Sequence, residues 1–155
     1  MKKIECAGII FHTLETNRVL FLYRLQSRRR HVWSIPGGKL ENGETPWEGA
    51  IREVKEEVGK VPTILQTLSL EVFKSSDGHF RFHTFLCLIR SEFIPILNDE
   101  HGGYAWSDHV NYPKPLHHGL HSTLSKKINR AKIETIGSMS NILRLQGNLQ
   151  LQTGQ

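Results

Sequence analysis

Several features are scarce in this 155-residue chain, and each scarcity narrows the class of protein. No apolar run approaches the ~20 residues that a membrane-spanning helix needs, so no membrane partner is expected. The basic start Met1-Lys2-Lys3 is followed by an apolar stretch, residues 7–11, that is too short for a secretion signal. No internal repeat or linker interrupts the chain, and its length fits a single domain.

Cysteine is also scarce. The two cysteines, Cys6 and Cys87, lie in apolar runs typical of strands, which favours buried free thiols over a disulfide. Free thiols are typical of a reducing compartment, so a cytoplasmic location is expected. A domain of this size buries roughly 68–70% of its unfolded surface and needs no cross-link or structural metal to fold.

Charge is abundant and unevenly distributed. The formal net charge is +5, from 20 Lys and Arg against 15 Asp and Glu. A basic chain suggests an anionic partner, which is a nucleic acid, a membrane surface or a phosphorylated small molecule, but nothing else in the sequence favours the membrane surface. Six of the fifteen acids nevertheless lie within residues 41–57. They are Glu41, Glu44, Glu48, Glu53, Glu56 and Glu57. A basic chain that collects its acids in one segment needs a functional reason for doing so.

The order of expected elements predicts the fold class. Apolar β-rich runs with turn residues between them predict two hairpins, at 4–23 and 64–90, and a short strand at 104–106. Residues 93–97 are either another short strand or the end of the preceding one. Helical spacing of apolar residues predicts helices over 46–58 and roughly 119–132. Strands mixed with helices in this order indicate an α/β protein with a mixed sheet covered by helices.

The C-terminal residues 137–155 are rich in Gln, Asn, Gly and Ser and contain a single charged residue, Arg144. Two interpretations stay open, a partly ordered tail or an added edge strand suggested by alternating leucines. The tail interpretation divides the chain into a domain over 1–136 and a tail over 137–155.

The helix expected over 46–58 has clear ends and an acidic patch. Thr45 is a suitable N-cap before Pro46, and Gly59 suits the C-terminal end. On a helical wheel an apolar stripe faces the core, while Glu53, Glu56 and Glu57 form a separate patch. That stripe consists of Trp47, Ala50, Ile51, Val54 and Val58.

The acidic patch is unfavourable by itself. Like charges spaced three and four residues apart destabilise a helix, and negative charge near its C-terminus opposes the helix dipole. A solvated acidic face is one interpretation. The other is a bound Mg²⁺ or Mn²⁺, which prefers oxygen ligands and removes the repulsion. The preceding Pro36-Gly37-Gly38 predicts a break in regular structure and allows unusual backbone angles.

The spacing of these residues resembles a known signature, the Nudix box G-x5-E-x7-R-E-U-x-E-E-x-G-U, in which U is apolar. Lys60 stands at its last apolar position and is the one departure. The segment Trp33-x-x-Pro36-Gly37-Gly38, the pair Glu100-His101 and the later Trp106 are also similar to the family, so the resemblance covers roughly residues 3–133. The fixed positions of the box are filled by Gly38, Glu44, Arg52, Glu53, Val54, Glu56, Glu57 and Gly59.

The resemblance implies a Nudix-like α/β/α sandwich with a mixed β-sheet and a catalytic loop-helix. It implies hydrolysis of a nucleoside diphosphate linked to another moiety, with Mg²⁺ or Mn²⁺ as cofactor. Arg52 would then orient a carboxylate by pairing with Glu44 or Glu53. The general base would be a glutamate of the box helix or Glu100, which is also a candidate ligand. The other expected metal ligands are Glu53, Glu56 and Glu57, with a backbone carbonyl of Gly37 or Gly38.

Recognition of the substrate is less well defined by the sequence. Lys39, Arg24 and Arg28 are candidates for binding the phosphates that do not react. A (deoxy)nucleoside triphosphate or a nucleoside diphosphate sugar is the expected substrate, and a dinucleoside polyphosphate or an RNA 5′ end is the alternative. No other nucleic-acid partner is expected. A nucleotide- or RNA-binding module without turnover is the alternative of another class, and both a monomer and a homodimer stay open.

Overall fold

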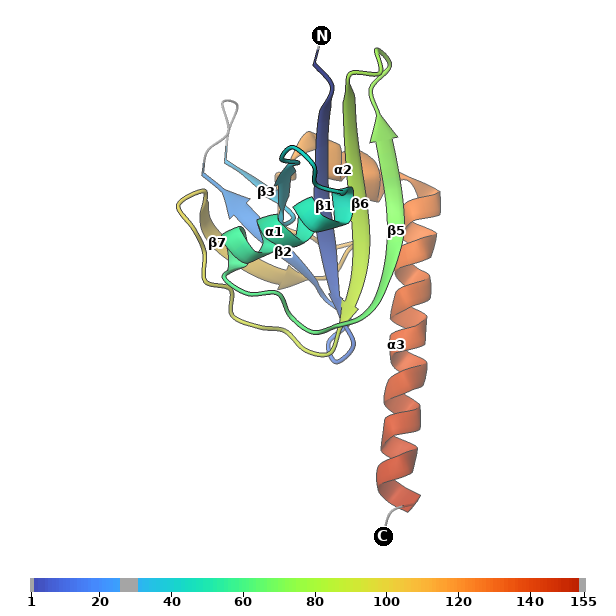
Figure 1. Ribbon diagram of the computed structural model, residues 1–155. Coiled ribbons are helices and arrows are strands. Elements are labelled where there is room, and N and C mark those ends of the chain that lie inside the picture. The colour runs from blue at the N-terminus through green and yellow to red at the C-terminus, as the bar shows by residue number, and fades with distance from the viewer. Residues whose placement is uncertain (1, 26–30, 154–155) are drawn as a thin grey trace.

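The computed structural model describes residues 2–25 and 31–153, with side chains described up to residue 147 except at position 140 (Figure 1). The described residues form seven strands and three helices. The strands are β1 (Ile4–Thr13), β2 (Val19–Arg24), β3 (Val32–Ser34), β4 (Gly37–Lys39), β5 (Ile64–Lys74), β6 (Phe80–Ile89) and β7 (His101–Ser107). The helices are α1 (Pro46–Val58), α2 (His118–Ser125) and α3 (Lys127–Thr153).

The strands form one mixed sheet, which confirms the predicted α/β class. The main path runs β3-β2-β1-β6-β5, while β4 pairs with β1 and β7 pairs with β2. The expected hairpins β1–β2 and β5–β6 are antiparallel, and β1 and β6 are joined in parallel from Ile4↔Phe80 to Thr13↔Ile89. The parallel pair places β1 in the middle of the sheet.

Helices cover both faces of the sheet, with α1 on one face and α2 and α3 on the other (Figure 1). Residues of β1 alternate between the two layers because successive side chains of a strand point to opposite faces. Ile9 and Phe11 pack with α1, whereas Ile10 packs with α2 and α3. All three side chains are buried, so β1 forms the centre of both cores.

The prediction of strand structure over residues 93–97 is wrong. This segment is irregular, and Phe93 packs edge-on against Phe11 and Trp106. Pro95 has no N–H group to donate to a strand, and the Ile96 N–H donates instead to the carbonyl of Val58, 2.9 Å away. The segment therefore closes the end of α1 rather than extending the sheet.

The helix expected over 119–132 is broken at Lys126, which has extended backbone angles (φ −78°, ψ 127°). Polar side chains around the break bond to Glu71 of β5, which accepts from Thr123 Oγ1 (3.0 Å), Lys126 Nζ (2.7 Å) and Asn129 Nδ2 (2.7 Å). Burial by itself raises the pKa of Glu71, but these three hydrogen bonds outweigh it and lower the pKa. The network attaches the junction of α2 and α3 to the sheet.

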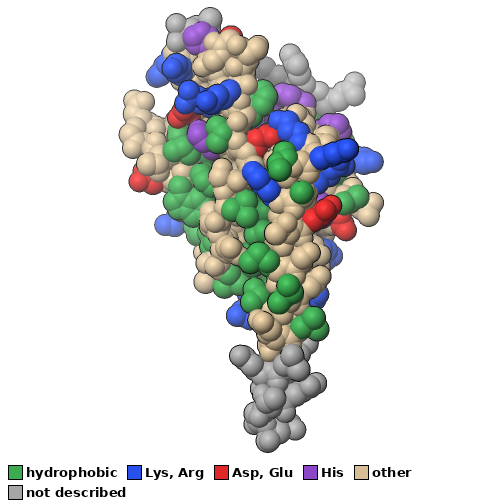
Figure 2. All heavy atoms as spheres, turned by 90° about the vertical axis from the view of Figure 1, so that its right-hand side faces the viewer, with side chains coloured by type: hydrophobic (Ala, Val, Ile, Leu, Met, Phe, Trp, Pro, Cys, Tyr) green, Lys and Arg blue, Asp and Glu red, His purple; other side chains and the backbone are tan. Residues whose placement is uncertain are grey.

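The alternative of an added edge strand after residue 136 is wrong, because α3 continues to Thr153, whereas the division into a domain and a partly ordered tail stays a prediction. The helix passes the end of the sheet (Figure 1), and hydrophobic side chains follow it in that direction (Figure 2). Ile133 is buried, whereas Ile142 is 56% exposed. Arg144 Nη1 donates to the carbonyl of Glu15, 3.0 Å away, which attaches the extended part of α3 to the β1–β2 turn.

No helix in the described part of the chain is long and apolar enough to cross a membrane.

Candidate active site

Helix α1 is fixed at both ends, as its sequence predicts. Thr45 Oγ1 accepts from the N–H of Glu48 and the Glu48 carboxylate accepts from the N–H of Thr45, both at 3.2 Å. At the other end Gly59 adopts a left-handed conformation (φ 84°) and donates to the carbonyl of Lys55. An N-cap of this kind contributes about 1 kcal/mol. The caps hold the helix in a defined register over the sheet.

The helix turns its apolar stripe to the core and its acidic patch toward β4 and β7. Ala50, Val54 and Val58 are fully buried, as the helical wheel predicts. The carboxylates are graded in exposure: the side chain of Glu57 is 2% exposed, that of Glu53 15% and that of Glu56 54%. A solvated acidic face would not bury Glu57, so that interpretation does not describe this patch.

Gly37 and Gly38 form strand β4, paired antiparallel to Ala7 and Gly8 of β1. The predicted break in regular structure is therefore wrong at these two residues, and neither uses the positive φ that glycine allows. Close approach explains these glycines instead. A Cβ on Gly37 would lie 2.5 Å from the carbonyl oxygen of Ala7, and a Cβ on Gly38 would lie 2.6 Å from the carboxylate carbon of Glu53.

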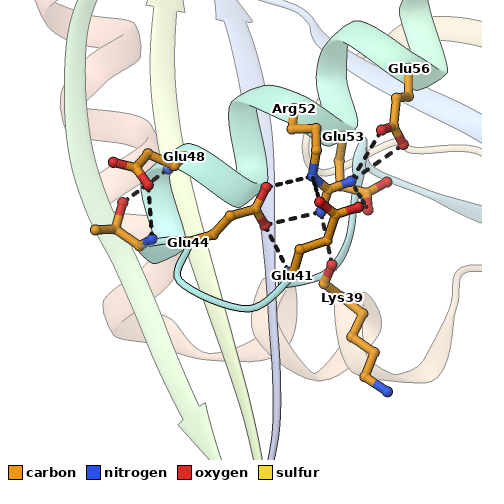
Figure 3. Close-up of polar contacts among 8 residues, drawn as sticks. Lys39, Glu41, Glu44, Glu48, Arg52, Glu53 and Glu56 are labelled. Carbon is orange, nitrogen blue, oxygen red and sulfur yellow. Dashed lines mark hydrogen bonds and ion pairs between the residues drawn. The ribbon is translucent and has the colours of Figure 1, made fainter.

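Arg52 lies between the carboxylates and bonds to them on two sides (Figure 3). Its Nε donates to Glu44 Oε1 (2.6 Å) and its Nη2 to Glu44 Oε2 (3.1 Å). Its Nη1 donates to Glu53 Oε1 (3.0 Å) and to both oxygens of Glu56 (3.3 Å). The hydrogen bonds from Arg52 lower the pKa of Glu44, and in return Glu44 raises the pKa of Arg52. Arg52 therefore contacts both of the partners that the resemblance offered as alternatives, and Glu56 as well.

Glu57 is the most perturbed group of the patch. Burial, followed by the charge of Glu53, raises the pKa of Glu57 to about 9, and the charge of Glu100 adds to this effect. Its Oε2 is buried without a hydrogen-bond partner, and His101 Nε2 lies 3.5 Å from it. Burial, together with the charge of Arg24, lowers the pKa of His101 to about 4, so His101 is uncharged at neutral pH.

These residues fit a hard divalent cation. Carboxylate oxygens are the ligands that Mg²⁺ and Mn²⁺ prefer, and a buried, unpartnered carboxyl oxygen is stabilised by a cation. Among the described residues no three acidic, histidine or cysteine groups yet enclose a common point. Arg52 donates to Glu53 and to Glu56, so its guanidinium engages two of the three carboxylates, while Glu57 lies within hydrogen-bonding distance of Glu53. Binding an ion would thus replace part of these contacts.

The other predicted site residues lie at different distances from the carboxylates of α1. Arg24 pairs across the strands with His101 and acts on its pKa, so Arg24 borders the patch. Glu100 is exposed, and its charge reaches Glu57. Lys39 contributes its carbonyl, which accepts from Arg52 Nη2 at 3.0 Å, while its ammonium points away from the carboxylates (Figure 3). Arg28 lies outside the described residues.

Sequence reasoning assigned no role to His101 and did not single out Asn98. Asn98 Oδ1 contacts the His101 ring at Nδ1, 3.2 Å away, and the ring in turn contacts Glu57. The sequence marks Glu100-His101 only through the family resemblance, because nothing in the spacing of this pair shows that β7 brings His101 against α1.

Comparisons with known proteins agree with this architecture. The NUDIX domain model matches residues 3–126, and the chain therefore belongs to the Nudix family. It is a pyrophosphohydrolase, as the named enzymes among its relatives indicate. The chain is 34% identical to the dihydroneopterin triphosphate diphosphatase of Haemophilus influenzae over 124 residues, which are 68% of this chain and 74% of that protein. It is 32% identical to the 8-oxo-dGTP diphosphatase of Proteus vulgaris over 85 residues, which are 55% of this chain and 76% of that protein.

Solved structures share the fold. The NUDIX domain of Shewanella oneidensis NrtR, complexed with ADP ribose, aligns with a TM-score of 0.69 at 15% identity, over 86% of this chain and 90% of that one. The MutT NUDIX hydrolase from Burkholderia pseudomallei aligns with a TM-score of 0.63 at 21% identity, over 82% of this chain and 99% of that one. At these identities the likeness establishes the fold, and the chemistry rests on the site residues.

Proposed function

We propose that this enzyme hydrolyses a pyrophosphate bond of a nucleoside triphosphate or a closely related triphosphate, with Mg²⁺ or Mn²⁺ as cofactor. The observation that carries the proposal is the buried Glu57 carboxyl group with an unpartnered oxygen, next to Glu53. An oxygen-rich, partly buried patch of this kind suits a cation that bridges protein carboxylates and substrate phosphates.

In this proposal each side chain has a defined task. Glu53, Glu56 and Glu57 would hold the metal, with a backbone carbonyl of Gly37 or Gly38. When bound, the metal activates the attacking water and neutralises the charge that develops at phosphorus. Arg52 would keep Glu53 and Glu56 oriented through the same guanidinium that bonds to Glu44. Glu100 or a glutamate of α1 would accept the proton of the attacking water.

The relatives favour triphosphates as substrates. The names of the Haemophilus influenzae and Proteus vulgaris proteins describe diphosphatases that act on dihydroneopterin triphosphate and 8-oxo-dGTP. The two compounds share a triphosphate attached to a nitrogen heterocycle through a carbon chain or sugar. We propose that Arg24, Lys39 and Arg28 bind the phosphates of this group. A nucleoside diphosphate sugar, a dinucleoside polyphosphate and an RNA 5′ end are the alternatives for the test below.

A substrate panel with product analysis in ¹⁸O-labelled water tests the proposal. The panel contains dGTP, 8-oxo-dGTP, dihydroneopterin triphosphate, a nucleoside diphosphate sugar, a dinucleoside polyphosphate and a 5′-triphosphorylated RNA. We expect a triphosphate to yield pyrophosphate and a monophosphate, with no turnover in the presence of EDTA. The labelled product identifies the phosphorus that water attacks. Binding without turnover on every compound would instead favour a nucleotide-binding module.

We also propose a cytoplasmic location. Cys87 is buried and Cys6 half-buried, and both are free thiols, which is typical of proteins from a reducing compartment. Fractionation of cells that express the protein tests this location.

A further inference from the structure

The beginning of β7 places an imidazole against the most buried carboxyl group of the site. His101 Nε2 lies 3.5 Å from Glu57 Oε2, and each side chain is only 2% exposed. The steps proposed above give His101 no task. A polar ring buried at this position needs a partner on each of its nitrogens, or it costs stability.

Asn98 provides the first partner and determines which nitrogen carries the proton. Its Oδ1 accepts from the N–H of Glu100 at 3.2 Å and lies 3.2 Å from His101 Nδ1. A backbone N–H can only donate, so the Asn98 atom that faces it is the oxygen. The same oxygen requires a proton on Nδ1. In a neutral imidazole Nε2 then has a lone pair, and this lone pair faces Glu57.

The backbone holds this arrangement in place. The His101 N–H donates to the carbonyl of Asn98 (3.3 Å), and the Leu25 N–H donates to the carbonyl of Glu100 (2.9 Å). The register between β2 and β7 shifts at this point, next to the pairing of His101 with Arg24. The ring therefore approaches Glu57 from a short loop that is bonded both internally and to the neighbouring strand.

We propose that His101, oriented by Asn98, is a positioning residue that holds the Glu57 carboxyl group for metal binding. This inference rests on the proposed function. His101 Nε2 and Glu57 Oε2 face each other at 3.5 Å between two side chains that are each only 2% exposed, so the ring limits where this oxygen can lie. The ring also occupies the space next to Oε2, so Glu57 has few alternative orientations. Partners of this kind orient the ligands of metal sites and tune their affinity.

Two substitutions separate the two ends of the ring. In H101Q the side-chain amide reaches the position of Nε2, so a polar atom still faces Glu57. In H101N the side-chain amide ends near the position of Nδ1, so the contact with Asn98 is the one retained. The measurements are Mn²⁺ affinity by titration with electron paramagnetic resonance, the melting temperature without metal, and kcat and KM on the best triphosphate.

We expect H101N to weaken Mn²⁺ binding about 10- to 100-fold, the range typical of an outer partner of a metal ligand. Its kcat should fall at low Mn²⁺ while KM for the nucleotide changes little. H101Q should keep Mn²⁺ affinity within about 3-fold of the unmodified enzyme, as rescue by a retained polar atom requires. H121N, at an exposed position of α2, is the matched control and should change neither affinity nor rate.

N98L is the second, independent variant, since it frees the ring and leaves His101 in place. We expect it to weaken Mn²⁺ binding in the same direction as H101N, even if H101N does not fold. Unchanged Mn²⁺ affinity in N98L and in a folded H101N would overturn the positioning role, whatever their melting temperatures. An unmodified protein that neither binds Mn²⁺ nor hydrolyses any triphosphate would contradict the proposed function itself, which is a different result.

Discussion

Helices α1 and α3 cover opposite faces of the same sheet, and they differ in what holds them. The 13-residue α1 has both ends capped, and its apolar stripe is buried along the helix. The 27-residue α3 has buried apolar side chains near its beginning, such as Ile133, whereas Ile142 and Leu145 further along are exposed. Only α1 presents a cluster of acids, and it is held firmly enough to keep them against β4 and β7.

The two helices are stabilised differently because only α1 has to hold a group of like charges. A patch of like charges disfavours a helix, so α1 needs its caps and its buried stripe to keep the carboxylates together. The extended part of α3 has no such group of like charges. Most of the stability of α3 must come from its first turns, which pack on the sheet.

Glu57→Gln should reduce kcat about 1,000-fold or more, because it removes a carboxylate proposed to hold the metal. The melting temperature without metal should hold or rise, because a buried acid is replaced by a neutral group of similar shape. Steady-state kinetics and thermal unfolding measure the two effects. Glu134→Gln on α3 is the control and should leave both unchanged. Retained activity in the Glu57 variant would show that the Glu57 carboxylate is not a metal ligand.

The pH dependence of the free energy of unfolding, measured without metal, should reveal the protonation of Glu57. The folded-state pKa of Glu57 is raised to about 9 from an ordinary value of 4.5. The folded protein therefore binds one more proton than the unfolded chain between these values, so the free energy of unfolding should fall as pH rises from about 5 to about 9. Urea unfolding in EDTA across this range measures the slope. The slope should flatten in the Glu57→Gln variant; equal slopes in both proteins would argue against a protonated Glu57.

Ile133→Ala and Ile142→Ala compare the two parts of α3 with the same substitution. Ile133 is fully buried, and its truncation should cost about 2–5 kcal/mol of unfolding free energy. Ile142 is 56% exposed, and its truncation should change stability by less than about 0.5 kcal/mol. Chemical denaturation measures both. A large loss at Ile142 would reveal that the extended part of α3 is covered in solution.

Glu100→Gln should lower kcat about 10-fold, less than the change at Glu57. Glu100 is exposed, and its charge reaches Glu57 without a direct bond. A base on a loop contributes typically about 10²–10⁴-fold, so a loss beyond 100-fold would assign the proton transfer to Glu100. An unchanged rate would show that Glu100 is a solvated loop residue without a role in catalysis.

Among the substitutions on α1 and near the active site, Thr45→Ala should have the smallest effect on the kinetic constants. It removes the N-cap of α1 and should cost about 1 kcal/mol of stability. The kinetic constants should change little at temperatures well below the midpoint, since Gly59 and the buried stripe still fix the helix. Thr45→Ser keeps the hydroxyl group and serves as the control. A collapse of kcat in Thr45→Ala would show that the capping box itself keeps the carboxylates in register.

Local signals explain why α1 could be predicted to its ends. Thr45, Pro46 and Gly59 act within a turn of their own positions, and their effects do not depend on the rest of the chain. Residues 137–153 lack such signals, since they contain a single charged residue, Arg144, and two glycines, Gly137 and Gly147. Their helix depends on contacts with β5 and β1 that are distant in sequence, such as the bonds of Asn129 to Glu71.

The same division applies to the active site. The sequence by itself determined the acids of α1, the arginine among them and the glycines before them. These residues lie on one loop and the helix that follows it, so their spacing along the chain is enough to identify them. Only the tertiary structure decided that Gly37 and Gly38 are required by close approach, that Arg52 holds three carboxylates at once, and that Asn98 and His101 reach Glu57. The physical reason is that burial and contact between separate elements depend on how the sheet joins them, and no local pattern of residues records this.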